Sequence, residues 1–179
     1  MGAGPIGLAI IKCLKIRQPG QIIVAEVAPN RGRFAQKFGA TAVIDPREQD
    51  VVSKCKELCD GQGPDIAIDC AGVAASIKAA CSAVRNRGTV VNVSIWEKEI
   101  PFDMNALVFV EKRLLTALSY TTADFDAVIK ALDSGSLDVK EMITRVITMD
   151  RVVEDGILAL THEKDKDIKI IVDVRAALS

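Results

Sequence analysis

The sequence predicts an α/β fold in which helices cover both faces of a parallel sheet. Apolar segments of strand length, rich in β-branched residues, alternate with segments of helix length as far as Val93. Successive strand, helix and strand units of this length connect parallel strands through helical crossovers. A glycine-rich turn also stands directly before the first predicted helix. These observations together predict a doubly wound sheet.

The first elements follow from apolar runs and the residues that end them. Gly7 to Ile16 is strongly apolar and predicts a buried helix, which Gln18-Pro19-Gly20 ends. Gln21 to Val27 is a continuous apolar run, as expected for a strand buried on both faces. Asn30 is the predicted cap of the next helix, which runs to Phe38 before Gly39.

The same alternation continues through the middle of the chain. Strands are predicted at Thr41–Ile44, Asp65–Asp69 and Thr89–Val93, and helices at Glu48–Cys59 and Val73–Val84. After Ser94 this regular alternation ends, and a segment of mixed helices and strands follows. It comprises predicted strands at Ile100–Met104, Arg113–Tyr120 and Ile168–Val174, a short apolar stretch at Asn105–Val110, and helices at Ala123–Leu132 and Arg151–Leu160.

The glycines at the start of the chain have the spacing of a dinucleotide-binding turn. Gly2, Gly4 and Gly7 match G-x-G-x-x-G, with Pro5 and Ile6 between the last two. In a Rossmann-type fold the first glycine permits the tight turn, the second lets the backbone approach a pyrophosphate, and the third allows close packing. The helix that follows directs free N–H groups and its positive end toward the phosphates. This predicts a cofactor-binding site.

An acidic residue stands where such a site needs one. Glu26 ends the next predicted strand, nineteen residues after Gly7. Its carboxylate can accept hydrogen bonds from both ribose hydroxyls and would repel a 2′-phosphate, which favours NAD over NADP. Arg31 lies close enough to blur that preference. The alternative is that the glycines form a disordered tail and that Glu26 is only a charge at a strand end.

The turn lacks the strand that should lead into it. Only Met1 precedes Gly2, so the predicted Rossmann-type sheet lacks its first and central strand. Losing it exposes the edges of both neighbouring strands. We expect a rearranged sheet that closes the gap, self-association, or poor solubility.

Several motifs resemble the zinc-type medium-chain alcohol and polyol dehydrogenases. They are Gly2–Leu8, Phe38–Thr41, Asp65–Gly72 and Gly88–Val91, and within that family Val93–Glu97 and Tyr120–Thr121 are most similar to butanediol dehydrogenases, with sorbitol and threonine dehydrogenases as near relatives. The resemblance implies an NAD-binding domain at residues 1–120. It also implies that residues 121–179 would complete a catalytic domain that is absent here.

The resemblance also implies further site residues and an activity. It places the pyrophosphate on Gly4–Gly7 and the ribose on Glu26, and the nicotinamide side near Cys70, Ala71, Gly72, Val73, Val93, Ser94 and Ile95. The implied reaction is hydride transfer from a secondary alcohol or vicinal diol to NAD. The family's zinc ligands belong to the absent domain, so we expect no metal site and no catalytic residue in this chain.

The remaining candidate residues do not form a metal site or a catalytic site. Cys55 and Cys59 share a helix face, but with His162 they are only three candidate ligands, and the histidine is distant in sequence. Ser94 and Tyr120 have no base positioned by any motif. We interpret all of these as structural side chains.

The composition of the chain argues against some classes of binding partner and indicates a compartment. The formal charge of −1, without a basic block, argues against nucleic acid and anionic membranes, and no apolar run is long enough to span a bilayer. Five cysteines are too few for a secreted disulfide framework, so we expect a cytoplasmic protein. The resemblance implies a subunit contact through the strand pair near Ile100–Tyr120, and an unpaired apolar strand edge invites such pairing, so a homo-oligomer is expected there.

Three functional hypotheses remain. The chain is a truncated dehydrogenase that at most binds NAD, an active oxidoreductase completed by another chain, or a non-enzymatic module that assembles with itself. The first is favoured for the chain alone.

Overall fold

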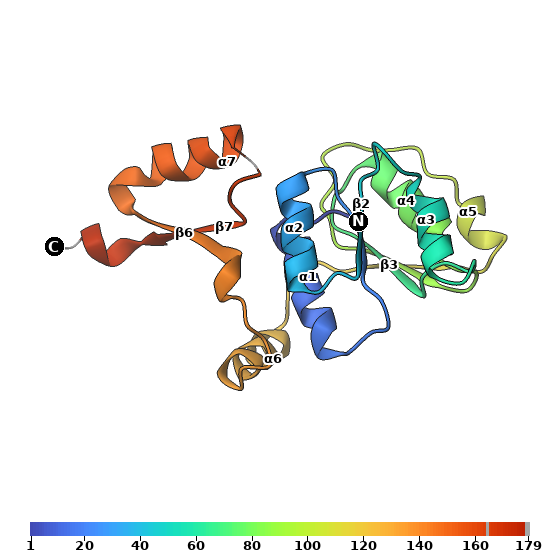
Figure 1. Cartoon of the computed structure of the whole chain (residues 1–179), viewed down its shortest axis with the longest axis horizontal. Helices are drawn as coiled ribbons and strands as arrows, with labels where there is room; N and C mark the ends of the chain where they lie inside the picture. Colours follow the sequence, from blue (N-terminus) through green and yellow to red (C-terminus); the bar gives the residue numbers. More distant parts are fainter. Residues whose placement is uncertain (164, 178–179) are drawn as a thin grey trace.

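The computed structural model describes residues 1–163 and 165–177. An α/β body extends from the N-terminus to β5, and a smaller unit that contains β6 and β7 lies beside it, with α6 on the connection (Figure 1). The body comprises α1 (Pro5–Ile16), β1 (Ile23–Ala25), α2 (Pro29–Phe38), β2 (Ala42–Ile44), α3 (Val51–Leu58), β3 (Ile66–Asp69), α4 (Ala74–Ala83), β4 (Thr89–Asn92), α5 (Asn105–Val108) and β5 (Arg113–Thr116).

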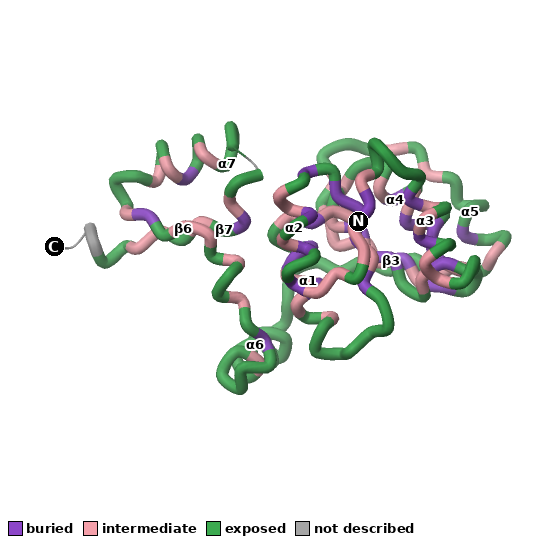
Figure 2. The backbone as a smooth tube through the Cα atoms, in the orientation of Figure 1, coloured by how far each residue is buried: buried purple, intermediate pink, exposed green. Residues whose placement is uncertain are grey.

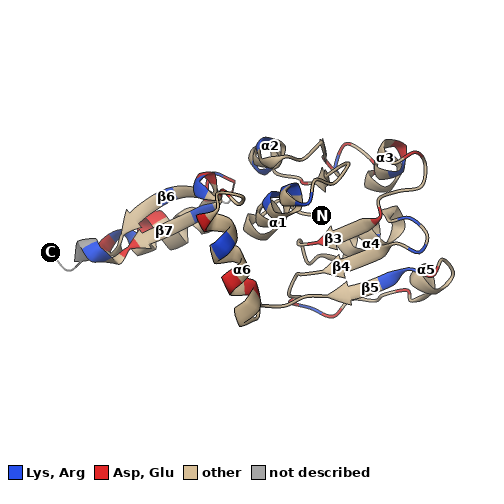
Figure 3. Ribbon diagram, turned by 90° about the horizontal axis from the view of Figure 1, so that it is seen from below, with Lys and Arg blue, Asp and Glu red and all other residues tan. Residues whose placement is uncertain are grey.

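The strands of the body are all parallel, as predicted, but they form two separate groups. β1 pairs with β2, while β3, β4 and β5 form a sheet in that order. Figure 3 shows these three strands side by side with β5 outermost. No strand of the described chain lies between β1 and β3, so the predicted rearrangement that closes the gap is wrong.

Helices cover both faces of these strands. Val24 on β1 packs with Leu8 and Phe38 of α1 and α2, whereas its neighbour Ala25 packs with Val51 of α3. Neighbouring strand residues point to opposite faces, so α1 and α2 lie on one face and α3 on the other. A third core cluster joins α4 to β3 and β4 through Ile77, Ala80, Ala67 and Val90. The doubly wound arrangement is therefore confirmed.

The remainder of the chain is less buried. It comprises α6 (Thr122–Asp133), β6 (Ile143–Thr148), a π-helix (Val152–Leu158), α7 (Ala159–His162), β7 (Lys169–Asp173) and short 3₁₀ turns at Lys140–Met142, Met149–Arg151 and Val174–Ala177. β6 and β7 pair in parallel. Ile168, just before β7, is buried against the α1 and α2 core, which ties this unit to the body. No residue of α6 is buried (Figure 2).

Several predicted boundaries are wrong. The second helix begins at Pro29 after Ala28, so Asn30 lies inside it and does not cap it. The predicted strand at Ile100–Met104 is absent, because its backbone has no partner strand and Ile100 and Phe102 pack instead against the core cluster that includes α4. The largest of the other differences are at Gln21–Val27, where only Ile23–Ala25 is strand, at Glu48–Cys59, where the helix is Val51–Leu58, at Arg113–Tyr120, where the strand ends at Thr116, and at Arg151–Leu160, where a π-helix is followed by α7.

The strand β6 was not predicted. Its residues Ile143–Thr148 show no strict alternation of polar and apolar side chains, and only Ile147 is buried. Its identity depends on pairing with β7, more than twenty residues later in the chain.

Candidate functional site

The glycine turn forms at the N-terminus of α1. Gly2 has φ +84°, a left-handed conformation that favours glycine. A Cβ atom on Gly7 would overlap the carbonyl oxygen of Gly2, so the turn and the helix can approach this closely only with glycine at position 7. Around a Cβ atom on Gly4, by contrast, there is open space. Packing within the protein therefore does not require glycine at position 4, and the lack of a side chain there leaves room beside the backbone.

The start of α1 offers hydrogen-bond donors to that space. Gly4 is the N-cap and makes no side-chain cap, the first turn carries no acidic residue, and Pro5 occupies the first helical position. The first N–H groups of a helix have no partner within it, and the helix dipole makes this end positive. These groups and the room beside Gly4 fit a phosphate-bearing ligand.

Glu26 links β1 to the glycine turn. It follows Ala25 at the end of the strand and is 8% exposed. Its Oε2 atom accepts a hydrogen bond from the amide of Ala3 at 2.6 Å, and Oε1 accepts one from the amide of Ala28 at 2.8 Å. Each carboxylate oxygen has a further lone pair. Glu26 therefore positions the turn while keeping acceptor capacity for hydroxyl groups.

The loops after β3 and β4 reach the same place. Gly2 lies against Ala71, and Gly7 faces Cys70. Gly72 has φ +65°, and a Cβ atom there would lie 3.1 Å from the Cβ atom of Ser94. The parallel strands thus bring the predicted residues from the turn and from both loops together at their carboxyl ends.

A buried carboxylate joins these two loops. Asp69 is fully buried at the end of β3, and its Oδ1 atom accepts a hydrogen bond from the amide of Ala71 at 3.3 Å. The hydroxyl of Ser94 lies 3.3 Å from Asp69 Oδ2 and donates to Asn92 Oδ1 at 2.6 Å. Sequence reasoning missed Asp69, Asn92 and Ala3. An aspartate that ends an apolar strand was the only signal available, in the segment Asp65–Asp69.

Apolar side chains remain exposed around this edge. Val73 is 53% exposed and Ile95 is 78% exposed, although both are predicted site residues. Ile6, at the start of α1, is exposed as well. Val93 lies beside them, where its amide donates to the carbonyl of Asp69 at 3.0 Å. Such surfaces suit the flat faces of aromatic rings.

Arg31 lies further along α2. Its guanidinium is 3.9 Å from the carboxylate of Asp165, in the C-terminal unit. Glu26 itself accepts hydrogen bonds from the amides of Ala3 and Ala28.

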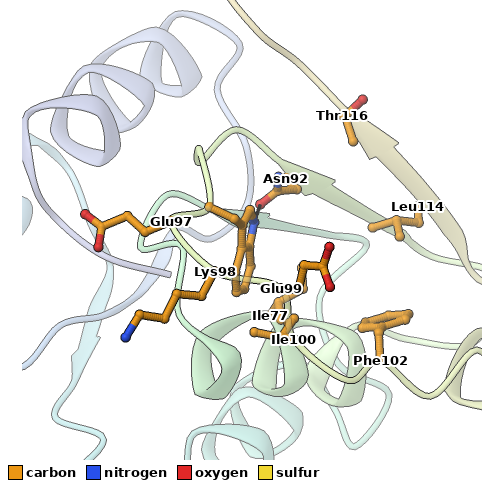
Figure 4. A pocket seen from close by; sticks show the side chains of 10 residues that line it. Ile77, Asn92, Glu97, Lys98, Glu99, Ile100, Phe102, Leu114 and Thr116 are labelled. Carbon is orange, nitrogen blue, oxygen red and sulfur yellow. Dashed lines mark hydrogen bonds between the residues drawn. The ribbon is translucent and has the colours of Figure 1, made fainter.

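A separate hollow lies beyond the loop after β4. It has a volume of about 630 Å³ and lies between α4, β5 and the segment that follows Trp96 (Figure 4). Trp96 and Asn92 both line it, and Trp96 donates a hydrogen bond from Nε1 to Asn92 Oδ1 at 3.2 Å. The hollow contains none of the predicted site residues.

The described residues do not fit a metal site. Among them, no group of three or more histidine, cysteine, aspartate or glutamate side chains is arranged to hold a metal ion. Cys55 is buried and no disulfide bond forms in this part of the chain. None of its helices has the length and apolar character needed to cross a membrane.

Comparison with known proteins gives a consistent result. The profile of a family described as zinc-binding dehydrogenase matches residues 5–134. A probable diacetyl reductase of Saccharomyces cerevisiae, named as (R)-acetoin forming, is 34% identical over 96% of this chain and 43% of its own length. The (R,R)-butanediol dehydrogenase of Bacillus subtilis is 33% identical over 96% of this chain and 49% of its own length.

Solved structures agree with this fold. The crystal structure of 2R,3R-butanediol dehydrogenase from Bacillus subtilis matches with a TM-score of 0.89 and 32% identity, over 97% of this chain and 49% of that one. An alcohol dehydrogenase from Thermus matches with a TM-score of 0.89 at 23% identity, which concerns the fold alone. The chain thus spans about half the length of the relatives it matches.

Proposed function

Because this chain belongs to the zinc-binding dehydrogenase family, we propose that it binds NAD as the cofactor-binding part of an alcohol or diol dehydrogenase. The observation that carries the proposal is the contrast between its glycines. Gly7 is required for packing, whereas Gly4 faces open space beside the N-terminus of α1. A glycine that internal packing does not require is expected where the backbone must closely approach a pyrophosphate.

Each end of the cofactor has residues of suitable chemistry. The pyrophosphate would lie on Gly4–Gly7, where the first amides of α1 would donate to it. The adenosine ribose would donate its hydroxyls to Glu26, whose negative charge disfavours the 2′-phosphate of NADP. Cys70–Val73 and Val93–Ile95 would hold the nicotinamide side, with Ser94 fixed between Asn92 and Asp69.

The bound cofactor would accept hydride at the nicotinamide ring. The relatives' names support a secondary alcohol or vicinal diol as the donor in a complete enzyme. We propose that residues 1–120 form the cofactor domain and that residues 121–179 belong to a catalytic domain. The resemblance places the family's zinc ligands in the half that this chain does not span, and we propose on that ground that the chain by itself binds cofactor without oxidising the alcohol. Completion by another chain is the alternative.

We also propose self-association through β5. This strand is the outer edge of its sheet, and all four of its residues are exposed. Leu115 is 53% exposed and Leu118 is 76% exposed. An apolar edge of this kind pairs readily with a second copy. The predicted strand at Ile100–Met104 takes no part, because it is absent from the fold.

Calorimetric titration of the chain with NAD and with NADP tests the proposal. We expect saturable binding of NAD and at least about tenfold weaker binding of NADP, a difference of about 1.4 kcal/mol. The matched variant is Gly4→Ala, whose added methyl group meets nothing within the protein but projects into the proposed pyrophosphate space. This variant should have the same free energy of unfolding as the parent and should bind NAD poorly. Equal NAD affinity in both proteins would contradict the proposed site.

A further inference from the structure

A second hollow, the amino-end hollow, lies where β3, β4 and β5 begin. Its volume is about 180 Å³. The carboxyl ends of β3 and β4 carry the loops that meet the glycine turn, so this hollow lies at the opposite end of the sheet (Figure 3). The lining residues come from the last turns of α3 and α4 and from the loops that lead into the three strands, and they are Lys56, Gly61, Gln62, Ser82, Val84, Asn86 and Lys112.

The lining carries two ammonium groups and no carboxylate. Neither Lys56 nor Lys112 forms an ion pair within the described residues. Lys112 donates one hydrogen bond from Nζ, to the carbonyl of Cys81 at 2.6 Å, which leaves two N–H groups of its ammonium for another acceptor. Burial lowers the pKa of Lys112, and the positive charge of Lys56 lowers it further. The two ammonium groups therefore lie close enough to repel each other.

The carboxylates nearest in sequence do not neutralise this charge. Glu57 pairs with Lys54 at 2.6 Å, and Asp65 pairs with Arg85 at 2.6 Å. Asp60 stands in the turn before β3 but does not line the hollow. The positive charge of the lining thus has no counterpart among the side chains that form it.

The ends of the helices offset only part of that charge. α3 ends at Leu58 and α4 at Ala83, so the negative ends of both helix dipoles lie beside the hollow. Each end amounts to about half an elementary charge, so two ammonium groups exceed the two helix ends by about one positive charge. An anion from outside the chain would balance this excess.

Neutral donors complete the lining. The side chains of Gln62, Ser82 and Asn86 form no hydrogen bond within the described residues. A hydroxyl group and two carboxamides can each donate to an oxygen atom. Donors that converge from separate segments, together with two ammonium groups, match an oxyanion that has several acceptor oxygens.

The loops around the hollow are held in fixed and unusual conformations. A Cβ atom on Gly63 would overlap the carbonyl oxygen of Ala83, so this turn packs directly on the end of α4. Three residues next to lining residues have left-handed backbone without being glycine. They are Asp60, Arg87 and Glu111, with φ of 51°, 60° and 52°. Such conformations are uncommon and gather at ligand-binding sites.

We propose that the amino-end hollow binds a phosphate group, either as the free ion or as the ester of a small organic molecule. Lys56 and Lys112 would supply the charge, and Ser82 and Asn86 would donate to the remaining oxygens. A dianion suits two ammonium groups better than a carboxylate does, because the attraction grows with the product of the charges. A ligand bound here would leave the proposed dinucleotide site open.

The test is a titration of the whole chain with inorganic phosphate, without dinucleotide, followed by NMR. We expect saturable shifts of the backbone amides of Gly61 and Asn86 and of the Gln62 carboxamide. Phosphate should bind at least about tenfold more tightly than acetate at equal ionic strength. Glycerol 3-phosphate distinguishes the two sources of the group, since tighter binding than phosphate would assign an ester and weaker binding the free ion.

Lys56→Met is the test variant and Lys54→Met is its matched control. Both lysines belong to α3, but Lys54 pairs with Glu57 and does not line the hollow. Each change removes one positive charge, so the net charge of the two variants is equal. The phosphate affinity should fall at least about fivefold in Lys56→Met and stay within about twofold of the parent in Lys54→Met.

Three outcomes would overturn the proposal. Shifts confined to the amides of Gly2–Gly7 would place the phosphate in the cofactor site instead. Equal losses of affinity in both lysine variants would show only an effect of net charge. Shifts that spread over many lysines without saturating would show unspecific attraction. Because the two sites are followed through different amides and no dinucleotide is present, failure here stands apart from failure of NAD binding.

Discussion

The carboxylate of Glu26 holds the backbone of Ala3, twenty-three residues earlier in the chain, through a hydrogen bond of 2.6 Å. The same side chain holds Ala28 with its other oxygen. Before any ligand is present, this side chain connects the strand end, the glycine turn and the start of α2. A residue predicted only as a ribose acceptor therefore also positions the turn.

Substitution at Glu26 should change both stability and binding. Glu26→Ala removes two nearly buried charge-assisted hydrogen bonds, which are worth about 1.5–3 kcal/mol each. The free energy of unfolding measured in urea should therefore fall clearly. NAD affinity should fall with it. Glu26→Gln keeps one acceptor and removes the charge, so it should lose less stability and raise the NADP to NAD affinity ratio. An unchanged ratio would remove Glu26 from the ribose site.

Gly7→Ala should destabilise the fold, in contrast to Gly4→Ala. The added Cβ atom would overlap the backbone carbonyl oxygen of Gly2, which can give way only if the turn itself shifts. We expect a loss of about 1–3 kcal/mol, the usual cost of overpacking, measured by urea denaturation. Equal stability of Gly7→Ala and the parent would mean that the turn does not pack on α1 as described.

Bound NAD should protect Cys70 from alkylation. Burial raises the pKa of the Cys70 thiol, so its reaction with iodoacetamide should be slow at neutral pH and faster as the pH rises toward and above 9. The thiol lies in the proposed site, facing Gly7. Exposed Cys13, on the outer part of α1, is the internal control. Equal protection of both cysteines would point to a general change in stability instead of local binding.

Asp50 should stabilise α3 in a pH-dependent way. Its side chain caps the helix by accepting a hydrogen bond from the amide of Ser53 at 2.7 Å, and this bond lowers the pKa of Asp50 below its usual value of 3.8. The contribution is fully present above that usual value and is lost as the pH falls through the lower folded-state pKa. Asp50→Ala should lower the free energy of unfolding at pH 7, and Asp50→Asn should lower it much less. A similar cost for both variants would argue against capping.

Self-association should depend on the outward edge of β5. The amides of Arg113 and Ala117 bond toward β4, so that of Thr116 faces outward. Thr116→Pro should reduce the mass measured by light scattering across a concentration series, while Thr116→Val retains the amide and should not. A monomeric parent, or a proline variant that associates normally, would rule out this interface.

Local patterns were sufficient for most of the α/β body. The apolar runs and glycine spacing predicted α1, α2, α4, the four parallel strands β1 to β4 and a further strand at β5, because hydrophobic periodicity and backbone freedom act over a few residues. The family and the region of the glycine turn were accessible in the same way. The C-terminal unit was predicted less well, since β6 exists through its pairing with distant β7.

What only the tertiary structure decided depends on contacts between distant residues. Glu26 meets Ala3, Asp69 meets Ser94, and Met1 bridges the edges at Ala25 and Ile68 together with Gly2, all across long stretches of chain. The sequence alone determined that a strand should precede the glycine turn. The folded chain decided that Met1 and Gly2 hydrogen-bond to both β1 and β3, because the helices packed on these strands hold their ends on either side of the turn.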